Sequence, residues 1–160
     1  MTITDQSLLD LVKTKDQAQQ LAENIDIVLK SMFTTTDTNK LLDESFAYTT
    51  KETLLLLIKE QNVDRKDIKA IEQFLQQIKT NLQNLPIIQL TIACEPKKEL
   101  IEKLSSWFVI HIKKVFLLSI TVDPSIIGGA IITYQGKYKN CSVQQKLMQL
   151  YKKGELALIP

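Results

Sequence analysis

The sequence predicts an α+β fold, in which an all-helical bundle at residues 1–85 precedes a small α/β-type domain at 86–153. Apolar residues of the first half recur every three or four positions, which is the period of a helix. That half contains no glycine and no proline. The first proline, Pro86, coincides with a change to alternating apolar and polar residues, so the domain boundary is expected there.

Two amphipathic helices account for much of the apolar content of the first half. One is predicted from Asp16 to about Phe33, and the more regular one from Asp64 to Asn84. In each, apolar side chains fall on one face and polar side chains on the other. The apolar face of the first helix needs a packing partner, and we expect about two thirds of the apolar face of the second to pack inside the bundle.

The segment between these helices is predicted to hold a loop and two shorter helices. The polar run 34–39 favours a loop, because Thr, Asp and Asn side chains compete for backbone hydrogen bonds, and a short helix is expected at 40–47. Thr49 with Glu52 three residues later is typical of a capping box. It precedes the apolar run 54–58, so a helix that is apolar all round is expected at the centre of the bundle.

The second half is predicted to run strand, helix, strand, strand, hairpin, short strand, helix. Because a helix joins the first two strands, these strands should be parallel. Ser142 is expected to cap the last helix, and 154–160 are expected to form a tail. The predicted elements are a strand around 88–92, a helix at 96–112, strands at 115–122 and 126–134, a turn at 135–136, a strand at 137–139 and a helix to about 153.

Composition indicates an ordinary globular protein, with 44% hydrophobic and 24% charged residues. No apolar run is long enough to cross a bilayer, and the N-terminus lacks the pattern of a secretory signal or presequence. Cys94 and Cys141 form no metal-binding or redox motif, so we expect reduced thiols, a cytoplasmic location, no metal and no cofactor.

Charge is distributed unevenly between the two halves. Residues 1–85 hold 10 basic and 13 acidic side chains, whereas 86–160 hold 10 basic and 5 acidic ones. Such a split is expected of segments that face different partners. The basic excess is modest compared with the lysine and arginine patches of proteins that bind nucleic acid.

Residues with catalytic potential have simpler structural roles. The only histidine, His111, lies among apolar residues of a predicted helix, which favours a packing or surface role. Asp123 before Pro124 is typical of a structural turn. Gly128-Gly129 lacks the spacing and the Lys-Ser/Thr pair of a phosphate-binding loop, so a bulge in a strand is expected.

The stretch Val122-Asp-Pro-Ser-Ile-Ile-Gly-Gly-Ala-Ile-Ile132 resembles the signature of the ATP synthase delta subunit, which is called the oligomycin-sensitivity-conferring protein in mitochondria. In that family too, a strand and a helix precede this segment, and a hairpin and a Ser-capped terminal helix follow it. Here the helix corresponds to residues 142–147. The resemblance covers residues 86–150.

The resemblance implies a non-catalytic stator subunit in the peripheral stalk of an F-type ATP synthase, at the cytoplasmic face of a bacterial inner membrane. Its helical domain would bind the alpha subunits of the catalytic head, and its second domain would hold the b-type stalk helices. Neither nucleic acid nor direct insertion into the membrane is implied, and ATP hydrolysis would belong to the partners.

Within this interpretation, exposed apolar residues are the candidates for partner binding. The head-facing candidates are Leu8, Leu9, Val12, Leu55 and Ile58. The stalk-facing candidates are Ile126, Ile127, Val143, Leu147, Leu150 and Tyr151. The residues expected to shape the turn that presents them are Asp123, Pro124, Gly128, Gly129 and Ser142.

The sequence is compatible with two other functions. A single-stranded RNA-binding module with a KH-like domain would share the strand, helix and glycine pattern, although the glycines are adjacent and have no basic neighbours. A small enzyme would need a concave pocket with converging polar groups. Salt-dependent binding of oligonucleotides would indicate the first.

Overall fold

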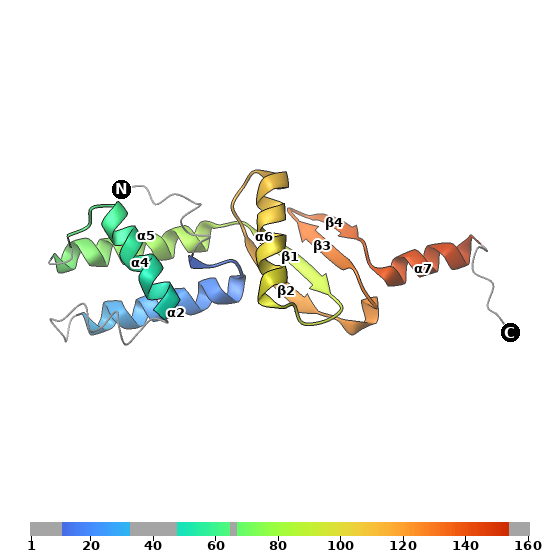
Figure 1. Cartoon of the computed structure of the whole chain (residues 1–160), viewed down its shortest axis with the longest axis horizontal. Helices are drawn as coiled ribbons and strands as arrows, with labels where there is room; N and C mark the ends of the chain where they lie inside the picture. The colour runs from blue at the N-terminus through green and yellow to red at the C-terminus, as the bar shows by residue number, and fades with distance from the viewer. Residues whose placement is uncertain (1–10, 33–47, 65–66, 154–160) are drawn as a thin grey trace. The chain divides into compact units, whose positions relative to one another are not determined.

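The computed structural model describes residues 11–32, 48–64 and 67–153 (Figure 1). Helices come first and the sheet follows, which confirms the α+β prediction. In chain order the elements are α2 (Lys15–Ser31), α4 (Tyr48–Glu60), α5 (Ile68–Asn84), β1 (Ile87–Ile92), α6 (Lys98–Ile112), β2 (Leu117–Val122), the 3-10 helix η1 (Pro124–Ile126), β3 (Ala130–Tyr134), β4 (Lys137–Asn140) and α7 (Val143–Lys152).

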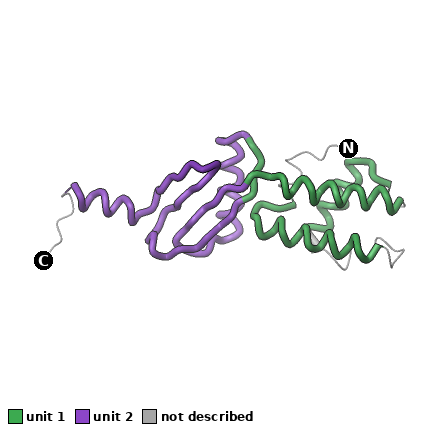
Figure 2. Tube along the Cα trace, turned by 180° about the vertical axis from the view of Figure 1, so that it is seen from behind, with its two compact units in different colours: residues 1–86, 114–117 green, residues 87–113, 118–160 purple. Residues whose placement is uncertain are grey.

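The chain divides into two compact units (Figure 2). Unit 1 comprises Met1–Pro86 with Lys114–Leu117, and unit 2 comprises Ile87–Lys113 with Leu118–Pro160. The division at Pro86 falls where the helical period of the sequence ends. The short segment 114–117, which ends with the first residue of β2, groups with the helices, although it comes from the second half of the chain.

Unit 1 is built on the pairing of α2 with α5, whose apolar faces are both buried. Thr14 begins α2 with a capping box, in which its Oγ1 accepts from the Gln17 N–H at 3.2 Å while Gln17 Oε1 accepts from the Thr14 N–H. Asp67 caps α5 by accepting from two backbone N–H groups, so this helix begins at Ile68 and not at Asp64 as predicted. Each large apolar side chain in this interface contributes about 1.5–3 kcal/mol by leaving water. The central ones are Leu21, Ile25, Val28, Phe74, Leu75 and Ile78.

Helix α4 supplies a third wall of the unit 1 core. Leu54, Leu57 and Ile58 are buried, but Leu56 is 60% exposed. The prediction of a helix buried all round is therefore wrong, because one face of α4 remains outside the core. The prediction that Thr49 caps this helix is also wrong, since the helix already includes Tyr48. The predicted loop at 34–39 and short helix at 40–47 lie outside the described residues, as does the predicted tail.

Unit 2 is a four-stranded mixed sheet in the order β2-β1-β3-β4. β1 and β3 are antiparallel, with Leu90 opposite Ile132, and β3 and β4 form the antiparallel hairpin. The Leu117 N–H donates to the Pro86 carbonyl at 2.9 Å, and six residues later the Asp123 N–H donates to the Ile92 carbonyl at 2.8 Å. Both strands therefore run in the same direction, which confirms the predicted parallel pairing of β1 with β2.

Helix α6 lies across one face of this sheet (Figure 1). The alternating residues of β1, Ile88, Leu90 and Ile92, are buried, as is Phe108 of α6. Leu100 and Trp107 do not cover the sheet, because both lie on the outer side of α6 and are exposed. Trp107 instead stacks on the ring of His111 with centroids 4.1 Å apart, so the histidine has a surface role.

Candidate partner-binding surface

The segment 123–129 forms a compact turn and not the start of a strand. The third strand was predicted from Ile126, but β3 begins at Ala130. Ile126 belongs to η1 and its side chain is almost completely buried, which corrects the expectation that it faces a partner. A buried isoleucine here anchors the turn to the domain.

Asp123 and Pro124 begin η1 as the sequence predicted for a structural turn. The Asp123 Oδ1 accepts a hydrogen bond from the Ser125 N–H at 2.9 Å, and Pro124 occupies the first position, where no N–H is required. The Ser125 side chain and then its backbone N–H donate to this carboxylate, and they hold the pKa of Asp123 below its ordinary value of 3.8.

This depressed pKa gives the turn a contribution to stability that depends on pH. The folded-state pKa lies below the unfolded value, so the stabilisation by Asp123 is present above about pH 4 and is lost as the pH falls through the folded pKa. We expect an NMR titration of the Asp123 carboxyl carbon to give a midpoint below 3.8, and Ser125→Ala to move that midpoint upward. A midpoint unchanged by Ser125→Ala would contradict the assignment of the hydrogen bond as the cause.

Ile127 adopts a backbone conformation that β-branched residues rarely adopt. Its φ is 66° and its ψ is −38°, and the Gly128 N–H donates to the Ile126 carbonyl at 2.7 Å across it. This is close to the tight, strained γ-turn. Backbone strain of this kind costs about 1–3 kcal/mol. The side chain held in this way is 62% exposed.

The two glycines that follow join the turn to α7. A Cβ on Gly129, whose φ is +75°, would stand only 2.4 Å from the Cys141 carbonyl oxygen, and a Cβ on Gly128 would meet Val143 at 3.3 Å. The Val143 N–H donates to the Gly128 carbonyl at 2.9 Å. Gly128 and Gly129 therefore allow the close approach of two backbone segments, where the sequence suggested a bulge within a strand.

Ser142 fixes the start of α7, as the sequence predicted. Its Oγ accepts from the Gln145 N–H at 3.2 Å, and its own N–H donates to Asn140 Oδ1 at 2.9 Å. Ser142 is completely buried. The direction in which α7 leaves the sheet is thus set by a hydrogen-bonded junction between Asn140 and Val143.

Helix α7 presents an apolar face that the described residues do not cover. None of the residues of α7 is buried, and its closest described neighbour is η1. Four apolar side chains at positions i, i+4, i+7 and i+8 lie on one face, and all four are exposed. We call Val143, Leu147, Leu150 and Tyr151 the α7 stripe. Met148, which was not among the predicted partner-binding residues, is exposed as well.

The head-facing candidates are placed differently from the prediction. Val12 is 3% exposed and Ile58 is 1% exposed, so both belong to the core of unit 1 and the expectation that they are exposed is wrong. Leu55 is partly buried against that core. Leu8 and Leu9 lie outside the described residues.

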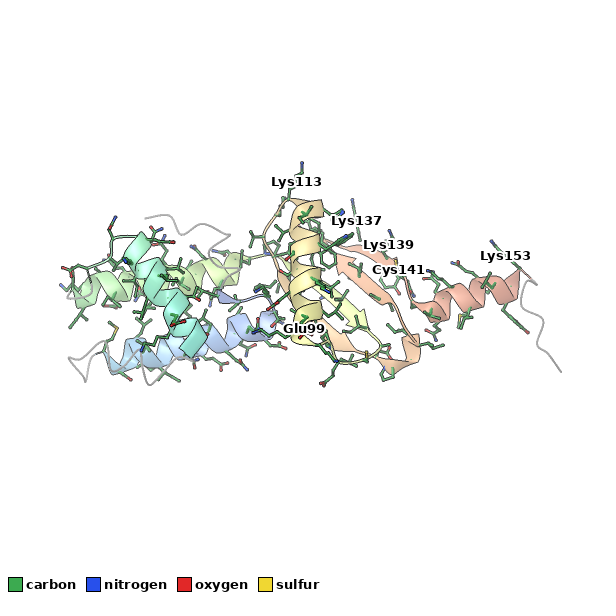
Figure 3. All side chains as sticks on the ribbon, viewed as in Figure 1. Glu99, Lys113, Lys137, Lys139, Cys141 and Lys153 are labelled. Atoms are coloured by element: carbon green, nitrogen blue, oxygen red, sulfur yellow. The ribbon has the colours of Figure 1, made fainter. Side chains whose placement is uncertain are left out.

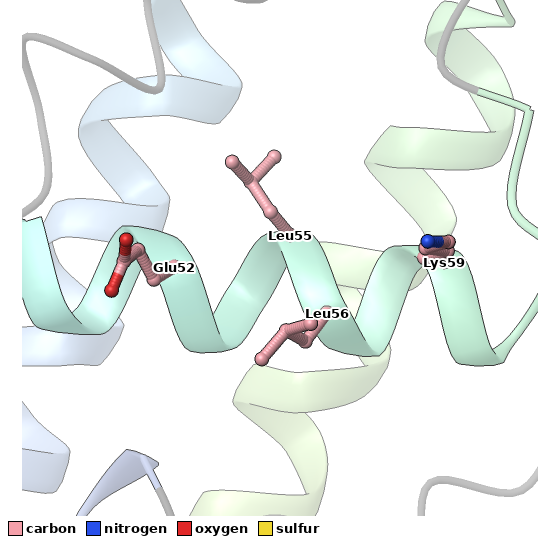
Figure 4. A pocket seen from close by; sticks show the side chains of 4 residues that line it. All are labelled: Glu52, Leu55, Leu56 and Lys59. Atoms are coloured by element: carbon pink, nitrogen blue, oxygen red, sulfur yellow. The ribbon is translucent and has the colours of Figure 1, made fainter.

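A shallow groove does open on the outer side of α4 (Figure 4). Its described lining consists of Glu52, Leu55, Leu56 and Lys59. The leucines give it an apolar floor and the two charged residues flank it. Leu56 has no counterpart among the predicted residues, because the uniformly apolar run 54–58 does not reveal which side chains point outward.

Within the described residues, no three His, Cys, Asp or Glu side chains gather as metal ligands would. No helix in the described ranges has the length and apolar character needed to span a membrane.

Comparison with known proteins adds one finding. The model of the family described as "ATP synthase delta (OSCP) subunit" matches residues 3–153. A search of curated proteins returns no match to the chain. The family match extends beyond the C-terminal segment in which the sequence signature lies and includes both compact units.

Proposed function

Because the chain belongs to the family of ATP synthase delta (OSCP) subunits, we propose that it is a non-catalytic stator, which links the catalytic head of an F-type ATP synthase to the b-type stalk helices and resists the torque of the rotor. Members of this family are structural subunits of the peripheral stalk. In the proposal, ATP hydrolysis and proton translocation belong to the partner subunits.

The exposed α7 stripe carries the stalk-facing half of the proposal. A helix that buries none of its own residues but aligns four apolar side chains gains stability when a second helix covers them. Leu147 lies near the middle of the stripe, where the energetically dominant contacts of an interface are usually found. Ile127 is proposed to extend this surface, because its side chain is exposed and the next residue, Gly128, is hydrogen-bonded to Val143 at the start of α7.

The head-facing half of the proposal rests on the groove of α4. Leu55 and Leu56 would contact the apolar side of an alpha-subunit segment, while Glu52 and Lys59 would form the polar rim. This assignment replaces Val12 and Ile58, which hold the core of unit 1 together. In the proposal, residues 1–85 bind the catalytic head and residues 86–153 bind the peripheral stalk.

Resistance to torque requires bodies that do not deform, and each unit has features that provide this. Unit 1 has a continuous buried core and an ion pair between Lys79 Nζ and Asp26 at 2.6 Å, which joins α5 to α2. Unit 2 has a hydrogen-bonded sheet. The proposed location is the cytoplasmic face of a bacterial inner membrane, where the protein is held peripherally by its partners.

Affinity purification from native membranes tests this function. The tagged full-length chain is captured after mild solubilisation, in low and in high salt, and mass spectrometry identifies the chains that accompany it. We expect catalytic-head subunits and b-type stalk subunits in the same eluate. Capture of RNA or unrelated proteins without these subunits would contradict the stator function and favour the RNA-binding alternative.

Neighbouring isoleucines in the turn should respond oppositely to substitution. Ile127→Gly removes backbone strain and an exposed side chain, so we expect the free energy of unfolding to stay constant or rise by up to about 1 kcal/mol, while stalk capture falls. Ile126→Ala removes a buried side chain and should cost about 2–4 kcal/mol. Chemical denaturation measures the free energy of unfolding, and quantitative co-purification measures stalk capture. Equal loss of stability in both variants would contradict the strained-turn geometry.

A further inference from the structure

Lysines accompany the apolar surface of α7, and acidic residues do not. Residues 124–153 contain five lysines and no aspartate or glutamate. Three of the five lie on or beside α7, namely Lys146, Lys152 and Lys153, and all three are exposed. A partner that covers the α7 stripe must therefore approach a positively charged margin.

The lysines are placed asymmetrically around the stripe. Val143, Leu147 and Leu150 follow the four-then-three spacing of the inner positions of a coiled coil. In that frame Lys146 and Lys153, seven residues apart, fall on the same flanking row, whereas the opposite flanking row holds Gln144 and Tyr151. One margin of the stripe is basic and the other is uncharged.

Lysines of the neighbouring hairpin lie on the same side. Figure 3 shows the labelled Lys137 and Lys139 of β4 and Lys153 at the end of α7 along one edge of unit 2, the upper edge in that view. Lysines on an edge strand also discourage pairing with strands of other molecules. This role explains Lys137 and Lys139 of β4, and no binding partner needs to be invoked for them. Lys146 of α7 and Lys153, the residue that caps the C-terminus of this helix, need a different explanation.

From this asymmetry we infer that the stalk helix packed on the α7 stripe carries a row of acidic side chains along the edge that faces Lys146 and Lys153. Charged residues beside an apolar seam select the partner and fix its direction and register. The inference rests on the proposed stator function and specifies the chemistry of the partner.

An anionic membrane surface is the other class of partner that a basic amphipathic helix can meet. Helices that lie on membranes generally carry a broad apolar face with Trp or Phe and with cationic residues on the polar face. Helix α7 has neither Trp nor Phe, and Lys146 and Lys153 lie along one margin of its stripe while the opposite margin carries no charge. These features favour a protein helix.

Charge reversal tests the inference. In the full-length tagged chain, K146E/K153E is compared with wild type and with K98E/K103E, which makes the same charge change at two exposed lysines of α6. The ratio of captured b-type stalk subunit to captured head subunits is measured by mass spectrometry, so the head serves as an internal reference. We expect this ratio to fall about tenfold for K146E/K153E, to fall in high salt for wild type, and to be unchanged for K98E/K103E.

The neutral variant K146Q/K153Q guards against fraying of α7 by glutamate near its C-terminus, and it should lower the ratio by about threefold. An unchanged stalk-to-head ratio in both variants would overturn the acidic edge and leave the stator function intact. Failure of wild type to capture any stalk subunit would overturn both. Binding of wild type, but not of K146E/K153E, to phosphatidylglycerol–phosphatidylcholine vesicles with unchanged stalk capture would assign the basic edge to a membrane.

Discussion

Leu147→Asp should abolish capture of the b-type stalk subunit and leave the fold of the chain intact. Leu147 is 41% exposed at the centre of the α7 stripe, so a carboxylate there remains solvated in the free protein. In the complex the same carboxylate would be buried against apolar side chains without a partner, which costs several kcal/mol. We expect stalk capture to fall by about a hundredfold or more.

The matched control is Gln149→Asp, which introduces the same charge on the polar side of α7. It should change stalk capture by less than about threefold, and circular dichroism should give the same spectrum for both variants and wild type. Stalk capture by Leu147→Asp at the wild-type level, with an unchanged spectrum, would contradict the assignment of the α7 stripe as the stalk-binding surface.

Gly129→Ala should produce the largest loss of stability among the Gly→Ala changes at Gly128, Gly129 and Gly136. The new Cβ would lie 2.4 Å from the Cys141 carbonyl oxygen, and the positive φ is itself unfavourable for alanine. Because the clash is with backbone, relief requires the junction between β4 and α7 to move. We expect a loss of about 3 kcal/mol in the free energy of unfolding.

Gly136→Ala is the control for this prediction, because Gly136 has nearly the same φ, +74°, and a Cβ there would meet nothing within 4 Å. It should lower the free energy of unfolding by only about 1 kcal/mol, because only the positive φ is unfavourable for alanine there. Denaturation followed by the fluorescence of Trp107, the only tryptophan in the chain, reports on unit 2. Equal losses for the two variants would contradict the close backbone contact at Gly129.

The fold class and several element boundaries could be predicted where a regular apolar period ends at a residue, such as proline or serine, that typically stops or starts a helix. The stripes of α2 and α5 are regular, and Pro86 marks the change of period, so the fold class could be predicted. Ser142 likewise marks the start of α7. The stripe of α7 follows from the same period, although its role in binding a partner stays a prediction.

Predictions of exposure failed where every residue in a run is apolar, so that no face can be distinguished. Predictions of secondary structure failed where local hydrogen bonds fold residues that favour a strand into a turn. In the run 54–58 every residue is apolar, so nothing in the sequence indicates that Ile58 points inward and Leu56 outward. Consecutive β-branched residues at 126–127 are typical of a strand. The hydrogen bonds of Asp123 and Gly128 fold them instead into a 3-10 turn followed by a γ-turn. Residue propensities do not predict which of these local hydrogen bonds form.

The central claim is that one chain bridges the catalytic head and the stalk, and reattachment of the head to stripped membranes tests it most directly. Native membranes are depleted of both the catalytic head and this chain, and purified head is then added back with no chain, with wild type or with Leu147→Asp. The account predicts that head sediments with the membranes only when wild type is present. Equal recovery of head with wild type, with Leu147→Asp and without the chain would contradict it.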